Sequence, residues 1–160
     1  MPPPAKPLPP WGWLPLLFKG TTMFKRTLSP RFAETDALGH LSNTTLPIWF
    51  EDAREPIFQI FNPELNLASW NLILARIEVD FVRQIYYGSE VVIRTYVIKV
   101  GNTSFTLLQE AWQKGELAAR GTATMVYFDY ASQHSAKIPE IYREQLEEHK
   151  LEGEEVIHSN

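Results

Sequence analysis

The sequence predicts an α+β domain in which a curved antiparallel β-sheet wraps around one long central helix. Three observations lead to this prediction. One long helical pattern occupies residues 44–61, four strand patterns follow it between residues 75 and 127, and short turns join those strands. A helix with one apolar face must be covered, and the apolar face of the sheet that follows is the surface available to cover it.

The central helix has apolar side chains at steps of three and four residues, which places them on one face of a 3.6-residue period. Asn43 or Thr44 is expected to cap it by accepting a hydrogen bond from a free N–H of the first turn. Pro56 has no N–H to donate to the carbonyl of Asp52, so we expect the helix to bend or loosen there. The apolar face consists of Leu46, Trp49, Phe50, Ala53, Ile57 and Phe61.

A polar turn precedes this helix and contains Glu34, Asp36, Gly39, His40 and Asn43. The glycine allows a positive φ or a close approach by a ligand. The N-terminal end of a helix concentrates free N–H donors and favours negative charge. Backbone N–H groups at positions 40–43 are therefore candidate donors to a carbonyl that becomes an oxyanion.

The strands are predicted from alternating apolar and polar residues and from the turns that separate them. Pro30 indicates an edge or a bend in the first strand, because proline lacks the N–H that a ladder needs. Gly121, inside the last strand, indicates a close approach by another backbone or by a ligand. The expected strands are 24–32, 75–81, 91–100, 104–113 and 117–127, and a short amphipathic helix is expected at 138–149.

The composition limits the classes of function. The 160 residues are 44% hydrophobic, enough for one domain with a packed core. A net charge of −4 argues against a nucleic-acid surface. The chain has no cysteine, which excludes disulfides and thiolate metal sites and favours a reducing, cytoplasmic location. None of the four histidines lies three or four residues from another, so no local metal-binding motif is present.

Three segments are expected. Residues 1–22 are rich in proline and form an arm with no signal peptide or membrane span; they either precede the native start at Met23 or pack on the domain or a partner. Residues 23–150 form a single domain. Residues 151–160 form an acidic tail that is expected to be mobile.

Two motifs in succession carry a family resemblance: Asp36-x-x-Gly39-His40-x-x-Asn43, and then Phe-Glu-Asp-Ala-Arg at residues 50–54. Later strand and turn patterns at residues 76–81, 87–88 and 101–105 agree with them in order. Over roughly residues 24–130, the chain resembles the 4-hydroxybenzoyl-CoA thioesterase family, a branch of the hotdog fold.

The resemblance implies a hydrolase of acyl-CoA or acyl-carrier-protein thioesters that uses no metal or cofactor. It also implies homodimers that join two sheets edge to edge, often paired into homotetramers, with active sites at the subunit interface. Asp36 matches the catalytic aspartate of the family. It can attack the carbonyl to form an anhydride, or it can activate water. His40 either contacts the reacting groups or is bonded within the turn, and Asn43 is expected to hold the turn or cap the helix.

Substrate contacts are expected on the helix and on the strands. Leu46 and Phe50 are candidates for the acyl chain, although an ordinary core role fits them better. Ser104 is a candidate for the pantetheine amides. Arg83, Lys99 and Arg120 are candidates for the CoA phosphates, which require cations or N–H donors. Glu34 and Glu51 are most simply solvated.

Two other functions remain open. One is a hotdog dehydratase of hydroxyacyl thioesters, whose chemistry pairs a histidine with an acidic residue; only His40 lies near the helix start. The other is a non-catalytic acyl-binding module that has kept the fold. Asp36 argues against the second, and a hydrolysis assay separates it from an enzyme.

Overall fold

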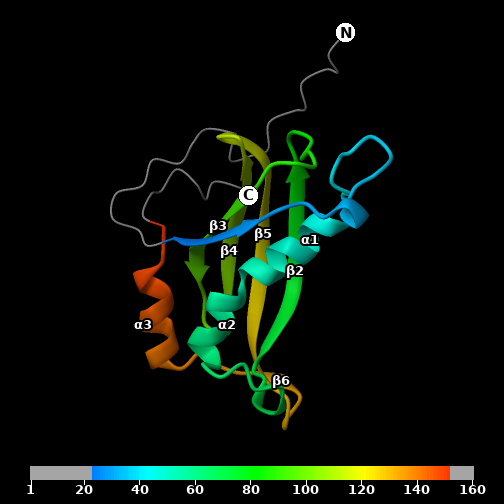
Figure 1. The fold of residues 1–160 in the computed structure, drawn as a ribbon. Coiled ribbons are helices and arrows are strands. Elements are labelled where there is room, and N and C mark those ends of the chain that lie inside the picture. Colours follow the sequence, from blue (N-terminus) through cyan, green and yellow to red (C-terminus); the bar gives the residue numbers. More distant parts are fainter. Residues whose placement is uncertain (1–22, 152–160) are drawn as a thin grey trace.

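The structure is a computed structural model that describes residues 23–151 (Figure 1). One antiparallel sheet forms the body of the domain, and helices α1 and α2 run across one face of it. The predicted α+β architecture is confirmed. The expectations for the arm at 1–22 and for residues 152–160 lie outside the described residues.

The strand order in the described sheet differs from the order in the chain. It runs β1-β3-β4-β5-β2, with the short β6 added to β5. The strand that follows the central helix, β2, therefore pairs with β5 and forms one edge, while β1 forms the other. The strands are β1 (Phe24–Leu28), β2 (Leu72–Phe81), β3 (Val91–Val100), β4 (Ser104–Gln113), β5 (Glu116–Asp129) and β6 (His134–Ser135).

The central helix is present as two segments, α1 (Thr45–Ala53) and α2 (Glu55–Phe61). All six residues of the predicted apolar face are buried, none more than 5% exposed. A third helix, α3 (Glu140–Glu148), packs near β3. Short 3-10 turns occur at Phe32–Glu34 and Leu67–Ser69.

The break between α1 and α2 lies at Arg54, two residues before Pro56, as expected. The N–H of Arg54 bonds to the carbonyl of Glu51 at 3.0 Å, so the carbonyl of Phe50 loses its usual helical partner. Pro56 offers no N–H to the carbonyl of Asp52. Two main-chain acceptors are therefore released above the sheet.

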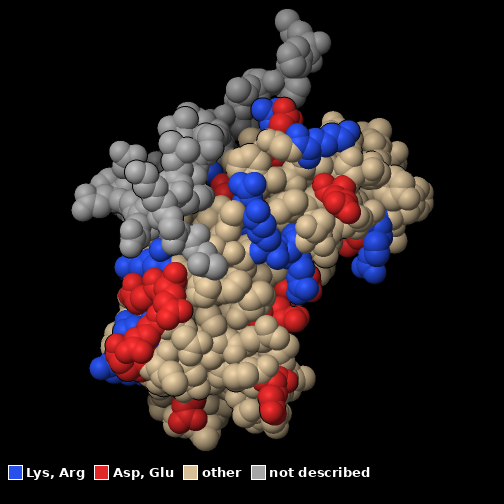
Figure 2. All heavy atoms as spheres, turned by 60° about the vertical axis from the view of Figure 1, so that its left-hand side comes forward, with Lys and Arg blue, Asp and Glu red and all other residues tan. Residues whose placement is uncertain are grey.

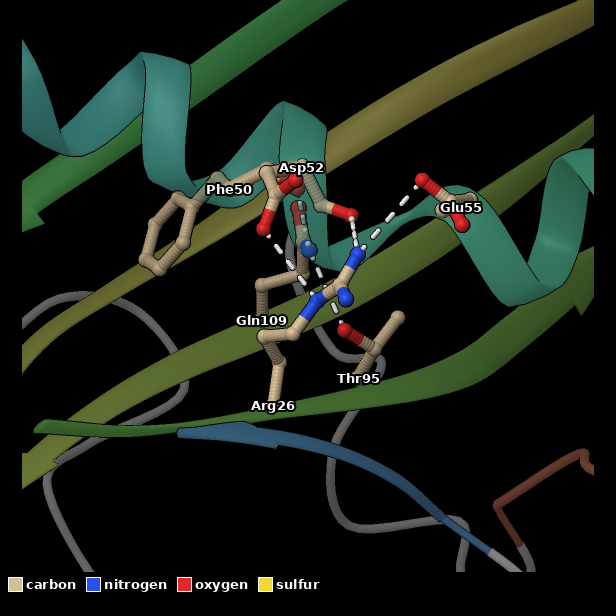
Figure 3. A network of polar contacts seen from close by, with 6 residues as sticks. All are labelled: Arg26, Phe50, Asp52, Glu55, Thr95 and Gln109. Carbon is tan, nitrogen blue, oxygen red and sulfur yellow. Dashed lines mark hydrogen bonds and ion pairs between the residues drawn. The ribbon is translucent and has the colours of Figure 1, made fainter. Parts of the chain in front are cut away.

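Side chains from the sheet satisfy both released carbonyls (Figure 3). Gln109 of β4 donates to the carbonyl of Phe50 at 2.8 Å and to the hydroxyl of Thr95 at 3.1 Å. Arg26 of β1 donates to the carbonyl of Asp52 at 3.0 Å and pairs with its carboxylate at 3.1 Å. Side chains of β1 and β4 thus hold the helix break in position, and Thr95 of β3 supports Gln109.

Several boundaries differ from expectation. The first strand ends at Leu28, and Phe32 lies in a 3-10 turn with 79% of its surface exposed. Pro30, which cannot donate to a ladder, separates the two. In β2 a register shift between Leu74 and Arg76 puts Leu74 on the same face as Ile77. The strand also starts at Leu72, earlier than the predicted residue 75.

The last described residues, Lys150 and Leu151, lie against β3. Leu151, expected in the mobile tail, is 5% exposed, and its N–H donates to the carbonyl of Val97 at 2.7 Å. The residue before it, Lys150, forms a parallel bridge with Val97. Leu151 therefore packs with Tyr96 and Leu108.

Charged side chains of both signs occur on the face that contains α3. Figure 2 shows acidic side chains gathered at lower left, where α3 lies, and a short band of Lys and Arg across the middle. The acidic residues of α3 are Glu140, Glu144, Glu147 and Glu148. Within residues 23–151, no helix has the length and apolar character needed to cross a membrane.

Gly121 of β5 lies where β2 and α1 come closest to the strand. A Cβ at this position would overlap the carbonyl oxygen of Glu78 and come within 3.2 Å of the Phe50 ring. The predicted close approach is therefore made by the neighbouring backbone of β2 and by an aromatic side chain of α1. The glycine lets the helix lie directly on the sheet.

We expect Gly121→Ala to lower the melting temperature by several degrees. The added methyl group must displace backbone, and overpacking of this kind costs about 1–3 kcal/mol. Thr122→Ala, on the opposite face of the same strand, is the control and should change stability by no more than about 0.5 kcal/mol. Equal melting temperatures for Gly121→Ala and the parent would show that α1 can shift without penalty.

Candidate functional site

Asp36 closes the turn in front of α1. Its Oδ1 accepts hydrogen bonds from the N–H groups of Leu38 at 2.8 Å and His40 at 3.0 Å. Its own N–H donates to the carbonyl of His40 at 2.8 Å. Gly39 adopts a φ of +76° with open space around its Cβ position, so the turn geometry requires the glycine. The carboxylate remains 49% exposed.

The carboxylate of Asp36 is stabilised in its charged form. The N–H groups of His40 and Leu38 hold its pKa below the ordinary value of 3.8, with a smaller contribution from the His40 side chain. At neutral pH the group is therefore an exposed anion, as a nucleophile or a general base must be.

His40 lies beside Asp36 within the same turn. Its Nδ1 is 3.7 Å from Asp36 Oδ2, and its side chain is 21% exposed. The ring stands edge-on to Tyr86, with 5.0 Å between ring centroids. The structure thus brings together the predicted pair Asp36 and His40, and adds an aromatic residue from the segment after β2.

The segment after β2 supports the turn through its backbone. The N–H of Leu41 donates to the carbonyl of Ile85 at 2.7 Å, and the N–H of Tyr87 donates to the carbonyl of Gly39 at 3.0 Å. His40 and Tyr86 lie opposite each other between these bonds, as an antiparallel bridge. The turn is therefore part of a short two-stranded ladder.

Glu34 attaches the turn to α1 and is not the solvated residue we expected. Its Oε2 accepts the indole N–H of Trp49 at 2.9 Å, and its Oε1 accepts from the backbone and side chain of Arg31. Only 13% of its side chain is exposed. Burial favours the neutral acid, but these hydrogen bonds outweigh it and keep the pKa of Glu34 below its usual range.

Asn43 is exposed, and its side chain has no hydrogen-bond partner in the described chain. The N-cap residue is Thr44, which has helical backbone angles (φ −77°, ψ −20°) and makes no side-chain cap. Ser42 bonds instead to the Thr44 hydroxyl at 2.8 Å. The expected cap by Asn43 or Thr44 is therefore wrong, because neither side chain accepts a hydrogen bond from the first turn of α1.

The expected oxyanion donors are mostly occupied. The N–H groups of His40, Leu41 and Ser42 already donate to Asp36, Ile85 and Glu34. Of positions 40–43, only the N–H of Asn43 has no acceptor within residues 23–151. This N–H lies next to the first turn of α1.

The predicted substrate residues do not gather around Asp36. Leu46 and Phe50 are 1% and 3% exposed and belong to the core between α1 and the sheet. Ser104 begins β4, and Gln113, which contacts the segment beside His40, ends it. The ten residues of β4 place these two ends about 30 Å apart. Within one chain, Ser104 is therefore remote from the turn.

The basic candidates divide into exposed and buried. Arg120 is fully buried and pairs with Glu110 at 2.6 Å, so it is not available to a phosphate. Arg83 and Lys99 are exposed, as is the helix carboxylate Glu51. Among residues 23–151, the Arg83 side chain makes one long ion pair, with Glu116 at 3.9 Å.

A hollow of about 320 Å³ lies beside the segment that supports the turn. It is lined by the ends of β4 and β5 and by the residues after β2, among them Arg83, Tyr86, Gln113, Lys114 and Glu116. Tyr86 thus contributes both to this hollow and to the contact with His40. Our reading of the sequence singled out only Arg83 from this group.

Large apolar side chains around the turn are exposed: Phe32 at 79%, Leu38 at 76%, Tyr86 at 52% and Tyr87 at 55%. The rings of Phe32 and Tyr87 contact each other edge to face. Exposed apolar residues gathered at one place usually mark a binding surface. The Tyr-Tyr-Gly turn at residues 86–88 is the feature of the sequence that could have indicated this exposed surface. Its position beside Asp36 depends on the fold.

Comparison with known proteins identifies the family of the domain. Residues 30–146 match the family model described as the thioesterase-like superfamily. A predicted thioesterase from Bacillus stearothermophilus is 40% identical, with a TM-score of 0.79, and the match covers 81% of this chain and 97% of that one. A thioesterase from Thermus thermophilus, complexed with coenzyme A and Zn, is 30% identical, with a TM-score of 0.69 and coverage of 76% and 95%.

A curated relative matches part of the domain. The uncharacterized protein YsmA of Bacillus subtilis (strain 168) is 34% identical over 94 residues, which span 56% of this chain and 61% of YsmA. The family model, in contrast, matches well over half of this chain. The protein therefore belongs to the thioesterase-like superfamily, and residues 30–146 form a thioester-hydrolase domain with the hotdog fold.

Proposed function

We propose that the protein hydrolyses an acyl-CoA thioester to the free acid and CoA at the turn formed by Asp36 and His40. The observation that carries this proposal is the carboxylate of Asp36, which is exposed, charged and oriented by two backbone N–H groups beside a histidine. In a domain of the thioesterase-like superfamily, such a group has the reactivity that acyl transfer to water requires.

Asp36 has two possible roles in hydrolysis. As a nucleophile, its oxygen attacks the thioester carbonyl, the C–S bond breaks, and the thiolate takes up a proton; water then hydrolyses the mixed anhydride. As a general base, it removes a proton from water, which attacks the carbonyl directly. In both routes the carbonyl oxygen becomes negative, and we assign its stabilisation to the free N–H of Asn43 at the positive end of α1.

Coenzyme A is the carrier we favour, because the 30%-identical thioesterase from Thermus thermophilus is complexed with it. Its phosphates need cations, and the hollow beside Tyr86 presents Arg83 and Lys114. We assign Arg83 to the phosphates, whereas Leu46 and Phe50 support α1 from the core. A chain without cysteine suits the reducing cytoplasm, where we place the protein.

The second subunit completes the site in this proposal. Strand β2 is an edge in the described sheet, and its Leu74 and Ile77 are 41% and 44% exposed. An unpaired edge of this length invites association unless it is covered. Two-fold pairing of β2 with the same strand of another copy removes the edge and brings a second chain toward the exposed apolar residues around Asp36.

We expect Asp36→Asn to fold normally and to lower kcat by at least ~100-fold. The asparagine oxygen can still accept from Leu38 and His40, but the charge needed to attack a carbonyl or to deprotonate water is lost. The loss corresponds to ~2.7 kcal/mol of barrier. KM should change much less, because binding depends on other contacts. Short-chain and aromatic acyl-CoA substrates, with detection of the free thiol, measure both constants.

The control for this variant is Asp129→Asn, which changes another turn aspartate that accepts a backbone N–H and a hydroxyl. It should keep the parent kcat.

The parent should also keep its activity in acid until the pH falls below 3.8, because the active carboxylate has a lowered pKa. Parent-like turnover by folded Asp36→Asn would reduce Asp36 to a turn residue. Release of enoyl product from a hydroxyacyl-CoA would indicate the dehydratase instead.

We expect the parent to be a dimer or tetramer in light scattering at micromolar concentration. Ile77→Lys places a charge on the exposed β2 edge and should shift the protein toward monomer. The control is Ile141→Lys on α3, where the isoleucine is 63% exposed and far from β2 in the chain; it should leave the assembly unchanged. A parent that is monomeric and still hydrolyses thioesters would contradict a site completed by two subunits.

A further inference from the structure

Gln113, the last residue of β4, is a buried polar side chain that the proposed chemistry does not use. It is 7% exposed. Its Oε1 accepts the N–H of Tyr86 at 2.9 Å, and its Nε2 donates to the carbonyls of Tyr86 at 2.8 Å and Ser89 at 3.0 Å. One amide therefore makes three hydrogen bonds to the backbone of a single loop.

These bonds replace the ones that a neighbouring β-strand would make to the backbone of Tyr86. Ile85 and Tyr87 use their backbone groups on one side to bind Leu41 and Gly39 of the Asp36 turn. In an extended segment, the N–H and C=O of the residue between them face the other side. There, the amide of Gln113 presents one acceptor and one donor to Tyr86, as a neighbouring backbone would. Without it, Tyr86 would lose the partners of two main-chain groups.

The same segment determines the geometry of Asp36. His40, opposite Tyr86, donates its N–H to the carboxylate of Asp36 and accepts the N–H of Asp36. If the segment moved, the bonds to Gly39 and Leu41 would move the turn with it. A displacement of 1 Å at a reacting group can lower a rate by about 100-fold.

We propose that Gln113 is a positioning residue for this site: its amide substitutes for a β-strand, holds residues 85–87, and through them orients His40 and Asp36. This inference rests on the proposed function for its effect on turnover, but its effect on the geometry of the turn can be measured without turnover.

The test uses two variants and a matched control. Gln113→Met keeps the length of the side chain and removes all three hydrogen bonds. Gln113→Glu keeps an acceptor for the N–H of Tyr86 but faces two carbonyls with a second oxygen. The control is Gln109→Met, because Gln109 lies on the same face of β4, is 2% exposed and bonds the backbone of α1 through its amide. All three variants should melt at lower temperature than the parent.

Only the Gln113 variants should affect the site. We expect kcat to fall by about 10- to 100-fold with KM within about three-fold. The carboxyl ¹³C titration of Asp36 should move up toward 3.8, because the N–H bonds that lower its pKa are weakened. In the described chain, His40 is the titratable side chain that faces Asp36; Arg83, Lys114 and Glu116 line the hollow beyond Tyr86. Gln113→Met leaves all of these charges unchanged.

Two outcomes would contradict a positioning role for Gln113. If Gln113→Met is destabilised as much as Gln109→Met but keeps the parent kcat and the parent Asp36 titration, Gln113 has only a structural role and the proposal fails. If the Gln113 variants do not fold, amide hydrogen exchange of the parent decides. If the Tyr86 N–H is protected as strongly as that of Leu41, its hydrogen bond to Gln113 is persistent and the proposal is supported. If the Tyr86 N–H exchanges at the rate of an open loop, the proposal is overturned.

The two proposals can fail separately. If the parent hydrolyses no thioester, the proposed function is wrong, while the Asp36 titration in Gln113→Met still tests the positioning role. If the parent is active and both readouts ignore Gln113, only the inference about Gln113 is wrong.

Discussion

Burial of the apolar face of α1 and α2 is the constraint on which the rest of this domain depends. Each of its six residues lies in the core against the sheet, and at Gly121 the absence of a side chain makes room for the ring of Phe50. Apolar burial contributes about 25 cal/mol per Å² to the free energy of folding, so burial of these six side chains strongly favours the observed position of the helix. Because the helix position is fixed in this way, the turn that precedes it has a defined place at one end of the sheet.

Two buried glutamines on one face of β4 form hydrogen bonds with backbone groups that would otherwise lack a partner. Gln109 satisfies the carbonyl of Phe50 that the Pro56 break releases, and it also accepts from Arg54, which is only 3% exposed. Gln113 satisfies the backbone of Tyr86 at the other end of the helix. An amide suits both places because it carries donors and an acceptor without charge, whereas an unpaired polar group in the core is strongly unfavourable.

The turn that contains Asp36 is hydrogen-bonded to neighbouring elements on two sides, and the carboxylate between them is exposed. Glu34 ties the turn to α1 through Trp49, and the segment at residues 85–87 ties it to the sheet. Asp36 uses one oxygen to hold the turn, while its other oxygen faces His40. A loop residue is therefore held in a defined position while its carboxylate stays half-exposed, which is the arrangement that the proposed role of Asp36 requires.

Local sequence was enough to predict the helix and its buried face, the break just before Pro56 and the strand pattern. It also placed Asp36, Gly39 and His40 together in the turn before the helix, and their role in chemistry stays a proposal. These features follow from periodicity, from proline and glycine stereochemistry, and from a compact motif. The folded chain alone reveals that β2 pairs with β5, that Arg120 is buried with Glu110, that Ser104 lies at the far end of β4, and that Gln113 supports the turn. Those outcomes depend on which strands become neighbours and on which groups each side chain then meets. The partners lie many positions apart in the chain, and no local pattern specifies them.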